Sequence, residues 1–250
     1  MKDSGKLVAA KLRFAEEGRF LTGDTAQPGN SRIPPGQGVV KGLPVLDLGV
    51  QPEIAIEAWT LALEGCVKQP RLLDHRAIAS LPQSRINVDI HCVTSWTRLD
   101  SQWEGVLLTD LVAGLGIDER APYVLLHCED GYTVNVRLCD LLASQSMLAH
   151  TYDGAPISTE HGGPYRLVIP SLYLWKSPKW LRRIEFLQEK IPGYWEQRGY
   201  HDIGNPWREE RYGPKQALPR PSEPTQSSPA PAIPKQSHWR RFVTWFNTYI

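Results

Sequence analysis

DIHCVTSWT, residues 89–97, is the segment around which the chain is organised, and Cys92 stands at its centre. Before the cysteine, the apolar residues Ile86, Val88 and Ile90 alternate with polar ones, which is the pattern of a half-buried strand. Small polar residues follow it, so we expect the strand to run into a tight turn. A thiol at the end of a buried strand can face a cavity, although most cysteines placed this way are small core residues. Spacing alone therefore favours a packing role for Cys92.

The composition is that of an ordinary globular protein. Of the 250 residues, 41% are hydrophobic and 22% are charged, which is enough for a substantial core. A formal net charge of +1, without a basic stripe interleaved with aromatic residues, argues against a nucleic-acid partner. No apolar run reaches the length of a membrane span, and residues 1–20 lack the apolar stretch of an export signal. We therefore expect a cytoplasmic protein without a transmembrane segment.

The cysteines show no CxxC spacing; they are Cys66, Cys92, Cys128 and Cys139. In a chain without an export signal we expect reduced thiols instead of a disulfide framework. The pairs His91-Cys92 and His127-Cys128 invite a zinc interpretation. Adjacent residues on a strand point to opposite faces, however, so each pair offers only one inward ligand, and a zinc site is not expected.

Composition and periodicity divide the chain into four parts. Residues 1–22 carry apolar side chains at helical spacing and predict an N-terminal helix. Residues 23–212 form the main domain and begin with a wrapping arm rich in Gly and Pro, whose apolar residues are too many for a free linker. Residues 213–237 are rich in Pro and predict a solvated linker. Residues 238–250 predict an amphipathic tail helix, which either packs on its own domain or docks on a partner protein or an acidic membrane surface.

Within the main domain, the periodicity predicts short strands interrupted by short helices. Strands are expected at 59–66, 123–128, 132–136, 149–152, 166–170 and 181–188, and helices at 72–81, 108–115 and 137–143. This mix is typical of the α+β class, with a mixed, mostly β-sheet core and short helices on the periphery. No GxGxxG or GxxxxGK[ST] motif is present, so no nucleotide-phosphate loop is expected.

HGGPYRLVIPSLYLWKSPKW, residues 161–180, is a second segment with chemical content. Its opening glycine turn lets backbone amides approach an anion closely. Arg166, Lys176 and Lys179 add cations, and the arginine can grip a phosphate with two parallel hydrogen bonds. By composition alone, surface cations around a hairpin explain the pattern equally well. The aromatic residues here can wall a pocket, although at such spacing they belong more often to a core; they are Tyr173, Trp175 and Trp180.

Together the two segments resemble the sulfite-oxidase fold of the oxidoreductase molybdopterin-binding family, over about Pro35 to Tyr212. In that family one cysteine ligates molybdenum, and the cysteine of HCVTSW falls on that position. The pterin-binding segment of the family has a His-Gly-x-Pro-x-Arg core followed by a Lys before Trp. His161, Arg166 and Lys179 match it. The C-terminal stretch of the domain is similar to a cytoplasm-type branch of sulfite-oxidase-like oxidoreductases.

The resemblance implies the sulfite oxidase catalytic-domain fold and a molybdenum–molybdopterin cofactor, with Cys92 as both metal ligand and catalytic residue. A soft thiolate suits a metal whose other sulfur ligands come from the pterin, and metal binding keeps that thiolate deprotonated. The cofactor phosphate suits cations and a glycine turn. The implied cofactor-binding residues are Tyr132, Thr133, His161, Arg166, Lys176 and Lys179, and the substrate-pocket candidates are Trp96, Tyr173 and Trp175.

Departures from the family pattern limit the choice of substrate. Sulfite oxidases place an arginine five residues after the ligand cysteine, where this chain has Thr97, and the adjacent Arg98 would point to the other face of an extended chain. The loop in which relatives carry Asn, Arg or His reads Leu46-Asp47-Leu48-Gly49. The sequence also contains no counterpart of the second β-domain or the haem module of sulfite oxidases. These features favour the branch that resembles the protein-methionine-sulfoxide reductase catalytic subunit, although that protein is exported.

The expected function is two-electron oxo transfer or reduction on a small S-oxo or N-oxo substrate, with an unidentified electron-transfer partner. One alternative is a non-catalytic scaffold or partner-binding module on the same fold, acting through residues 238–250. Another is a carrier that binds the pterin cofactor without turnover. The retained set of Cys92, His161, Arg166 and Lys179 favours the enzyme over the scaffold.

Overall fold

The structure is a computed structural model that describes residues 24–25 and 32–213. The N-terminal helix predicted for 1–22, the tail helix predicted for 238–250 and nearly all of the Pro-rich linker lie outside the described residues. No helix in the described part is long and apolar enough to cross a membrane.

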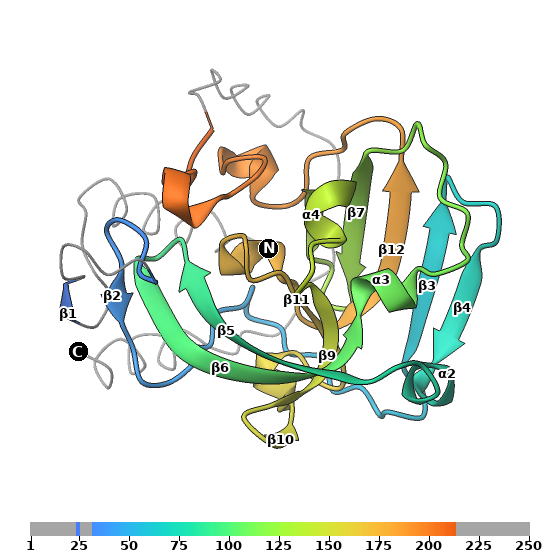
Figure 1. The fold of residues 1–250 in the computed structure, drawn as a ribbon, viewed down its shortest axis with the longest axis horizontal. Coiled ribbons are helices and arrows are strands. Elements are labelled where there is room, and N and C mark those ends of the chain that lie inside the picture. Colours follow the sequence, from blue (N-terminus) through green and yellow to red (C-terminus); the bar gives the residue numbers. More distant parts are fainter. Residues whose placement is uncertain (1–23, 26–31, 214–250) are drawn as a thin grey trace, which may run out of the picture. The chain divides into compact units, whose positions relative to one another are not determined.

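A long β-hairpin carries the DIHCVTSWT segment (Figure 1). Strand β5 (Ser84–Cys92) pairs antiparallel with β6 (Trp96–Leu107), and residues 93–95 form the turn between them. From Ile86 to Ile90 the apolar residues of β5 are buried and the polar residues between them are more exposed, which is the alternation seen in the sequence, whereas His91 is buried. The predicted strand that runs into a tight turn is therefore confirmed.

The hairpin belongs to a seven-stranded sheet. Its other strands are β1 (Asp24–Thr25), β2 (Gly38–Val39), β9 (Met147–Tyr152), β10 (Ala155–Pro156) and β11 (Arg166–Val168). Strand β6 pairs with β5 along most of its length, with the parallel strand β2 at residues 96–97, and with the antiparallel strand β9 at residues 103–107. Strand β11 pairs with β9, so the segment that begins at residue 161 joins the same sheet as the Cys92 hairpin.

A second sheet of five strands lies beside it in Figure 1, with β12 between β3 and β7. In order, its strands are β4 (Arg71–Asp74), β3 (Thr60–Gly65), β12 (Leu181–Leu187), β7 (Tyr123–Cys128) and β8 (Thr133–Arg137). The β3–β12 pair is parallel and the other pairs are antiparallel. Fully buried aliphatic and aromatic side chains of this sheet, among them Leu61, Leu126 and Phe186, form part of the core.

The helices are short and lie outside the sheets. They are α2 (His75–Ala79), α3 (Leu108–Leu111), α4 (Leu138–Leu141) and the 3-10 turns η1 (Thr159–His161), η2 (Leu174–Lys176), η3 (Glu196–Arg198) and η4 (Pro206–Arg208). The mixed sheets with few, short helices confirm the α+β prediction.

Two predicted elements need correction. The helix expected at 72–81 begins only at His75, because residues 71–74 pair with β3 and Asp74 then caps the helix, accepting a 2.8 Å hydrogen bond from the amide of Ala77. Residues 96–107, for which the sequence predicted no strand, form β6, which leads directly into α3. Gly105 permits this, because a side chain there would stand 2.1 Å from the carbonyl oxygen of Leu148 on β9.

Candidate active site

Cys92 is the last residue of β5, is only 4% exposed, and lines a cleft of about 820 Å³ counted out to its open mouth. Four further segments far apart in the sequence form the walls. They are the loop 43–48, residues 130–132, the segment 161–180, and the aromatic residues Trp195 and Tyr200. The sulfur is therefore at the edge of a cleft and not enclosed by hydrocarbon on all sides.

The cleft brings together most of the side chains that the sequence predicted for the site. Besides Cys92, its lining includes Tyr132, His161, Arg166, Lys179 and Trp175. The thiol lies at the end of β5 and Arg166 lies on β11, and the pairing β5–β6–β9–β11 joins the two strands.

Arg166 is a buried cation without an acidic partner. It is 3% exposed, and its guanidinium donates to the carbonyl oxygens of His161 at 2.9 Å and Ser177 at 2.8 Å. No carboxylate within the described part of the chain pairs with it, and burial lowers its pKa to about 10. A buried charge left with carbonyl dipoles alone is costly, so this position favours an anionic ligand.

Lys179 and His161 add two basic groups to the cleft lining, and together with Arg166 they form what we call the cationic wall. The ammonium of Lys179 donates to the carbonyl oxygen of Glu160 at 2.7 Å and lies 3.8 Å from the carboxylate of Asp47. The pKa of Lys179 is lowered to about 8, chiefly by burial, with the charge of Asp47 opposing the shift and that of Arg166 contributing to it. Burial also lowers the pKa of His161, again with a contribution from Arg166. The positive charges of these groups repel one another, and a bound anion would relieve this repulsion.

The two glycines after His161 allow the turn that follows it to pack closely against Lys179. Gly162 has φ +102°, and a side chain at this position would come within 2.6 Å of the Cβ of Lys179. A side chain on Gly163 would stand 2.1 Å from the carbonyl oxygen of Ile157. Both positions therefore require glycine, which brings the turn directly against Lys179.

A family profile described as "Oxidoreductase molybdopterin binding domain" matches residues 48–195, which is more than half of the chain. The chain belongs to this family. The matched range contains Cys92 and the whole cationic wall.

Individual relatives agree with the assignment. The uncharacterized oxidoreductase YuiH of Bacillus subtilis (strain 168) is 45% identical over 192 residues, which cover 76% of this chain and 97% of YuiH. The protein-methionine-sulfoxide reductase catalytic subunit MsrP of Gluconobacter oxydans is 25% identical, over 58% of this chain and 52% of that protein. The crystal structure of the sulfane dehydrogenase SoxCD from Paracoccus pantotrophus matches with a TM-score of 0.51 at 19% identity, over 56% of this chain and 41% of that one, and supports the fold.

The chain is therefore an enzyme of the sulfite-oxidase-like molybdopterin oxidoreductases, and its cofactor is molybdenum–molybdopterin, as the resemblance implied. The residues present fit that cofactor. The cleft lining offers both a thiol, which is a soft ligand, and a buried arginine that has no carboxylate partner among the described residues. No three His, Cys, Asp or Glu side chains of the described residues gather as a metal site, so the metal would need the sulfur ligands of its own pterin.

In this oxidoreductase, four of the predicted site residues lie outside the cleft lining. Trp96 is buried opposite Cys92 in the hairpin, and Tyr173 is buried behind Trp175, with their ring centroids 5.4 Å apart. Thr133 lies in β8 next to Tyr132, and its carbonyl oxygen accepts from the amide of Tyr194. These three residues lie outside the lining, so their contact with pterin or substrate stays a prediction.

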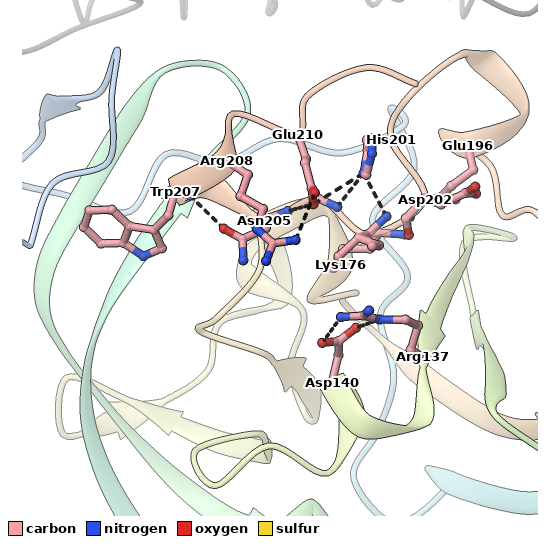
Figure 2. Close-up of polar contacts among 12 residues, drawn as sticks. Arg137, Asp140, Lys176, Glu196, His201, Asp202, Asn205, Trp207, Arg208 and Glu210 are labelled. Carbon is pink, nitrogen blue, oxygen red and sulfur yellow. Dashed lines mark hydrogen bonds and ion pairs between the residues drawn. The ribbon is translucent and has the colours of Figure 1, made fainter. Parts of the chain in front are cut away.

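Lys176 requires the clearest correction (Figure 2). Its ammonium is fully buried and donates to Glu196 Oε1 at 2.6 Å, to both the carbonyl and side-chain oxygens of Asn135, and to the carbonyl oxygen of Asp202. No donor is left for a phosphate. The lysine instead fastens the C-terminal segment of the domain to β8.

The structure also adds a residue that the sequence argument missed. Tyr200 lines the cleft, with its ring 4.8 Å from that of Trp195 and 5.2 Å from that of Trp175. Burial raises the pKa of its phenol well above the usual range, and Tyr212 and Cys92 contribute. The hydroxyl therefore stays protonated and lies within electrostatic range of the thiol. In the sequence, only the family resemblance of the C-terminal stretch of the domain could have indicated Tyr200.

The position that carries an arginine in sulfite oxidases is neutral and buried here. Thr97 has no exposed surface, and its hydroxyl lies 2.9 Å from Nδ1 of His91. The neighbouring Arg98 pairs with Asp153 at 3.2 Å, away from the cleft, as expected for the opposite face of a strand. In contrast, Asp47 of the loop 43–48 is a cleft residue, so a carboxylate occupies the wall where relatives carry other polar groups.

Proposed function

We propose that this oxidoreductase uses Cys92 as the protein ligand to molybdenum and acts on a small, uncharged S-oxide or N-oxide. One observation carries the proposal: the thiol of Cys92 and the unpaired buried cation of Arg166 open into the same cleft. A thiolate at one end and an anion site at the other are what a metal-bearing pterin phosphate requires.

In this proposal, Arg166 and Lys179 bind the phosphate end, and the glycine turn lets His161 approach the same group. When bound, the cofactor supplies two-electron oxygen-atom chemistry. The aromatic wall of Trp175 and Trp195 limits the access of water. Tyr200 keeps its proton at neutral pH, because burial raises its pKa, and so can donate a hydrogen bond to the oxygen of a substrate.

The preference for an uncharged substrate follows from the composition of the cleft lining. Leu46, Leu48 and Val93 are apolar, and Asp47 brings a negative charge. The Asp47 carboxylate is fixed by hydrogen bonds from the amide of Gly49 at 2.8 Å and the side chain of Gln51 at 2.7 Å. A carboxylate at this point repels sulfite, whereas a sulfoxide or an N-oxide carries no net charge. The electron-transfer partner that turnover requires is unidentified.

The test combines metal analysis with turnover. Purified protein should contain molybdenum near one per chain and should reduce dimethyl sulfoxide or trimethylamine N-oxide with reduced methyl viologen. Cys92→Ser should fold and lose this activity, whereas Cys139→Ser, which changes an exposed thiol outside the cleft lining, should keep it. Full activity in Cys92→Ser would refute the ligand assignment. Faster oxidation of sulfite than reduction of either oxide would refute the substrate class, and a stable protein that never takes up molybdenum would favour the scaffold alternative.

A further inference from the structure

The turn that presents Cys92 has an unfavourable backbone conformation. Ser95 has φ +70°, a left-handed value that is uncommon for a residue with a side chain, and its amide donates to the carbonyl oxygen of Cys92 at 3.1 Å. Such a conformation is energetically unfavourable and persists where surrounding groups hold it in place. The structure identifies these groups.

Two segments distant in sequence hold the turn from outside the hairpin. From the N-terminal arm, the side chain of Gln37 donates to the carbonyl oxygen of Cys92 at 3.1 Å, and the amide of Gly38 donates to that of Ser95 at 2.9 Å. From the C-terminal end of the domain, the guanidinium of Arg211 donates to the carbonyl oxygen of Val93 and to the hydroxyl of Ser95. Every peptide carbonyl from 92 to 95, except that of Thr94, therefore accepts a hydrogen bond.

Arg211 is well placed to act as the clamp. Its side chain is 12% exposed, and its guanidinium lies 5.2 Å from the centroid of the Tyr173 ring, which is itself fully buried. Hydrogen bonds from a charged donor are stronger than those from a neutral one. Arg211 is not part of the cleft lining, so it acts on the site only through the turn.

The clamped turn sets the immediate surroundings of the sulfur. The hydroxyl of Thr94 lies 3.2 Å from Sγ of Cys92, and when the sulfur is a thiolate the hydroxyl is the donor. A hydrogen bond to a metal-binding sulfur orients it and alters its electron donation. The position of Thr94 depends on its neighbours Val93 and Ser95, which are the two residues that Arg211 contacts.

We propose that Arg211 is a positioning residue for the Cys92 sulfur: it holds the turn 92–95 so that Thr94 donates to Sγ. The metal-related part of this inference rests on the proposed function, whereas the clamp itself exists in the polypeptide alone. The two parts can therefore be tested separately.

The first test uses cofactor-free full-length protein and measures iodoacetamide alkylation of each cysteine by mass spectrometry at one fixed pH. Arg211→Gln should raise the alkylation rate of Cys92 by about tenfold, because the variant loses charge-assisted hydrogen bonds that oppose local opening of the turn. The alkylation rate of Cys139 should stay unchanged. Arg211→Lys should give an intermediate rate. The matched control is Arg198→Gln, because Arg198 belongs to the same C-terminal segment and contacts only the carbonyl oxygen and ring of Tyr194 among the contacts described.

Unchanged alkylation of Cys92 in Arg211→Gln would overturn the proposal. Equal acceleration at all four cysteines would also overturn it, because that result indicates general unfolding. In the molybdenum-loaded protein, Arg211→Gln and Thr94→Val should both shift the sulfur-to-metal charge-transfer absorption, and Arg198→Gln should not. If the wild-type protein binds no molybdenum, the proposed function fails, and the alkylation rates still decide the role of Arg211.

Discussion

Lys176 and Lys179 are three residues apart in one segment, yet they belong to regions of opposite character. Lys176 lies in a closed cluster where Glu196 neutralises it and three oxygens of Asn135 and Asp202 complete its hydrogen bonds. Lys179 lies in the cleft, where its ammonium donates to the carbonyl oxygen of Glu160 and the nearest carboxylate, that of Asp47, is 3.8 Å away. A buried cation with a full set of partners stabilises the fold, whereas one with an incomplete set indicates a ligand site.

The largest expected effect tests the closed cluster. Lys176→Met should destabilise the domain by roughly 3–5 kcal/mol, because it leaves the buried carboxylate of Glu196 without its partner. Urea denaturation of cofactor-free protein measures this. The double variant Lys176→Met, Glu196→Leu serves as the control and should recover much of the loss. A single variant as stable as wild type would show that the cluster does not hold the C-terminal segment.

The next largest expected effect tests the cationic wall of the cleft. Arg166→Met should change the stability of the cofactor-free protein far less than Lys176→Met, because it removes a cation that has no carboxylate partner. Cofactor retention should instead fall by about thirtyfold, equivalent to roughly 2 kcal/mol for lost charge-assisted hydrogen bonds. Molybdenum per chain after gel filtration gives the retention. A large loss of stability with normal molybdenum retention would show that Arg166 serves the fold and not the cofactor site.

A smaller effect concerns pH. The pKa of Lys179 in the free protein is lowered to about 8, chiefly by burial, and a bound anion would raise it. Cofactor affinity should therefore be complete below pH 8 and decline as the pH rises through and above this value. Retention measured at pH 7 and pH 9 should differ by up to about tenfold in the wild type, and Lys179→Gln should show a flatter profile. An equally steep decline in that variant would assign the titration to another group.

The smallest effect is expected at an exposed cation on β12. Arg182 pairs loosely with Glu129 at 3.5 Å, and both side chains are solvent-accessible. Arg182→Ala should change the free energy of unfolding by less than about 0.5 kcal/mol and leave cofactor retention unaltered. The same denaturation and metal measurements apply. A clear loss of molybdenum in this variant would mean that the cationic wall extends beyond the cleft.

Local pattern was sufficient for much of the fold. The strands at 59–66, 123–128 and 181–188 are found within one or two residues of their predicted ends, because alternation over a strand is a local property. Strand β6 was not predicted, since a glycine such as Gly105 is unfavourable inside a strand unless the close approach of β9 is known. The shortened helix at 72–81 has the same origin, because pairing with β3 takes its first residues.

The sequence by itself determined the family and the principal chemical groups, since Cys92 and the spacing of His161, Arg166 and Lys179 are fixed along the chain. Only the tertiary structure decided which cations face the cleft, because neutralisation of Lys176 requires Glu196, twenty residues away, to fold back onto it. It alone added Tyr200 to the site and placed Arg211 against the turn after Cys92. Burial and pairing of charge depend on contacts between distant segments, which a local pattern does not contain.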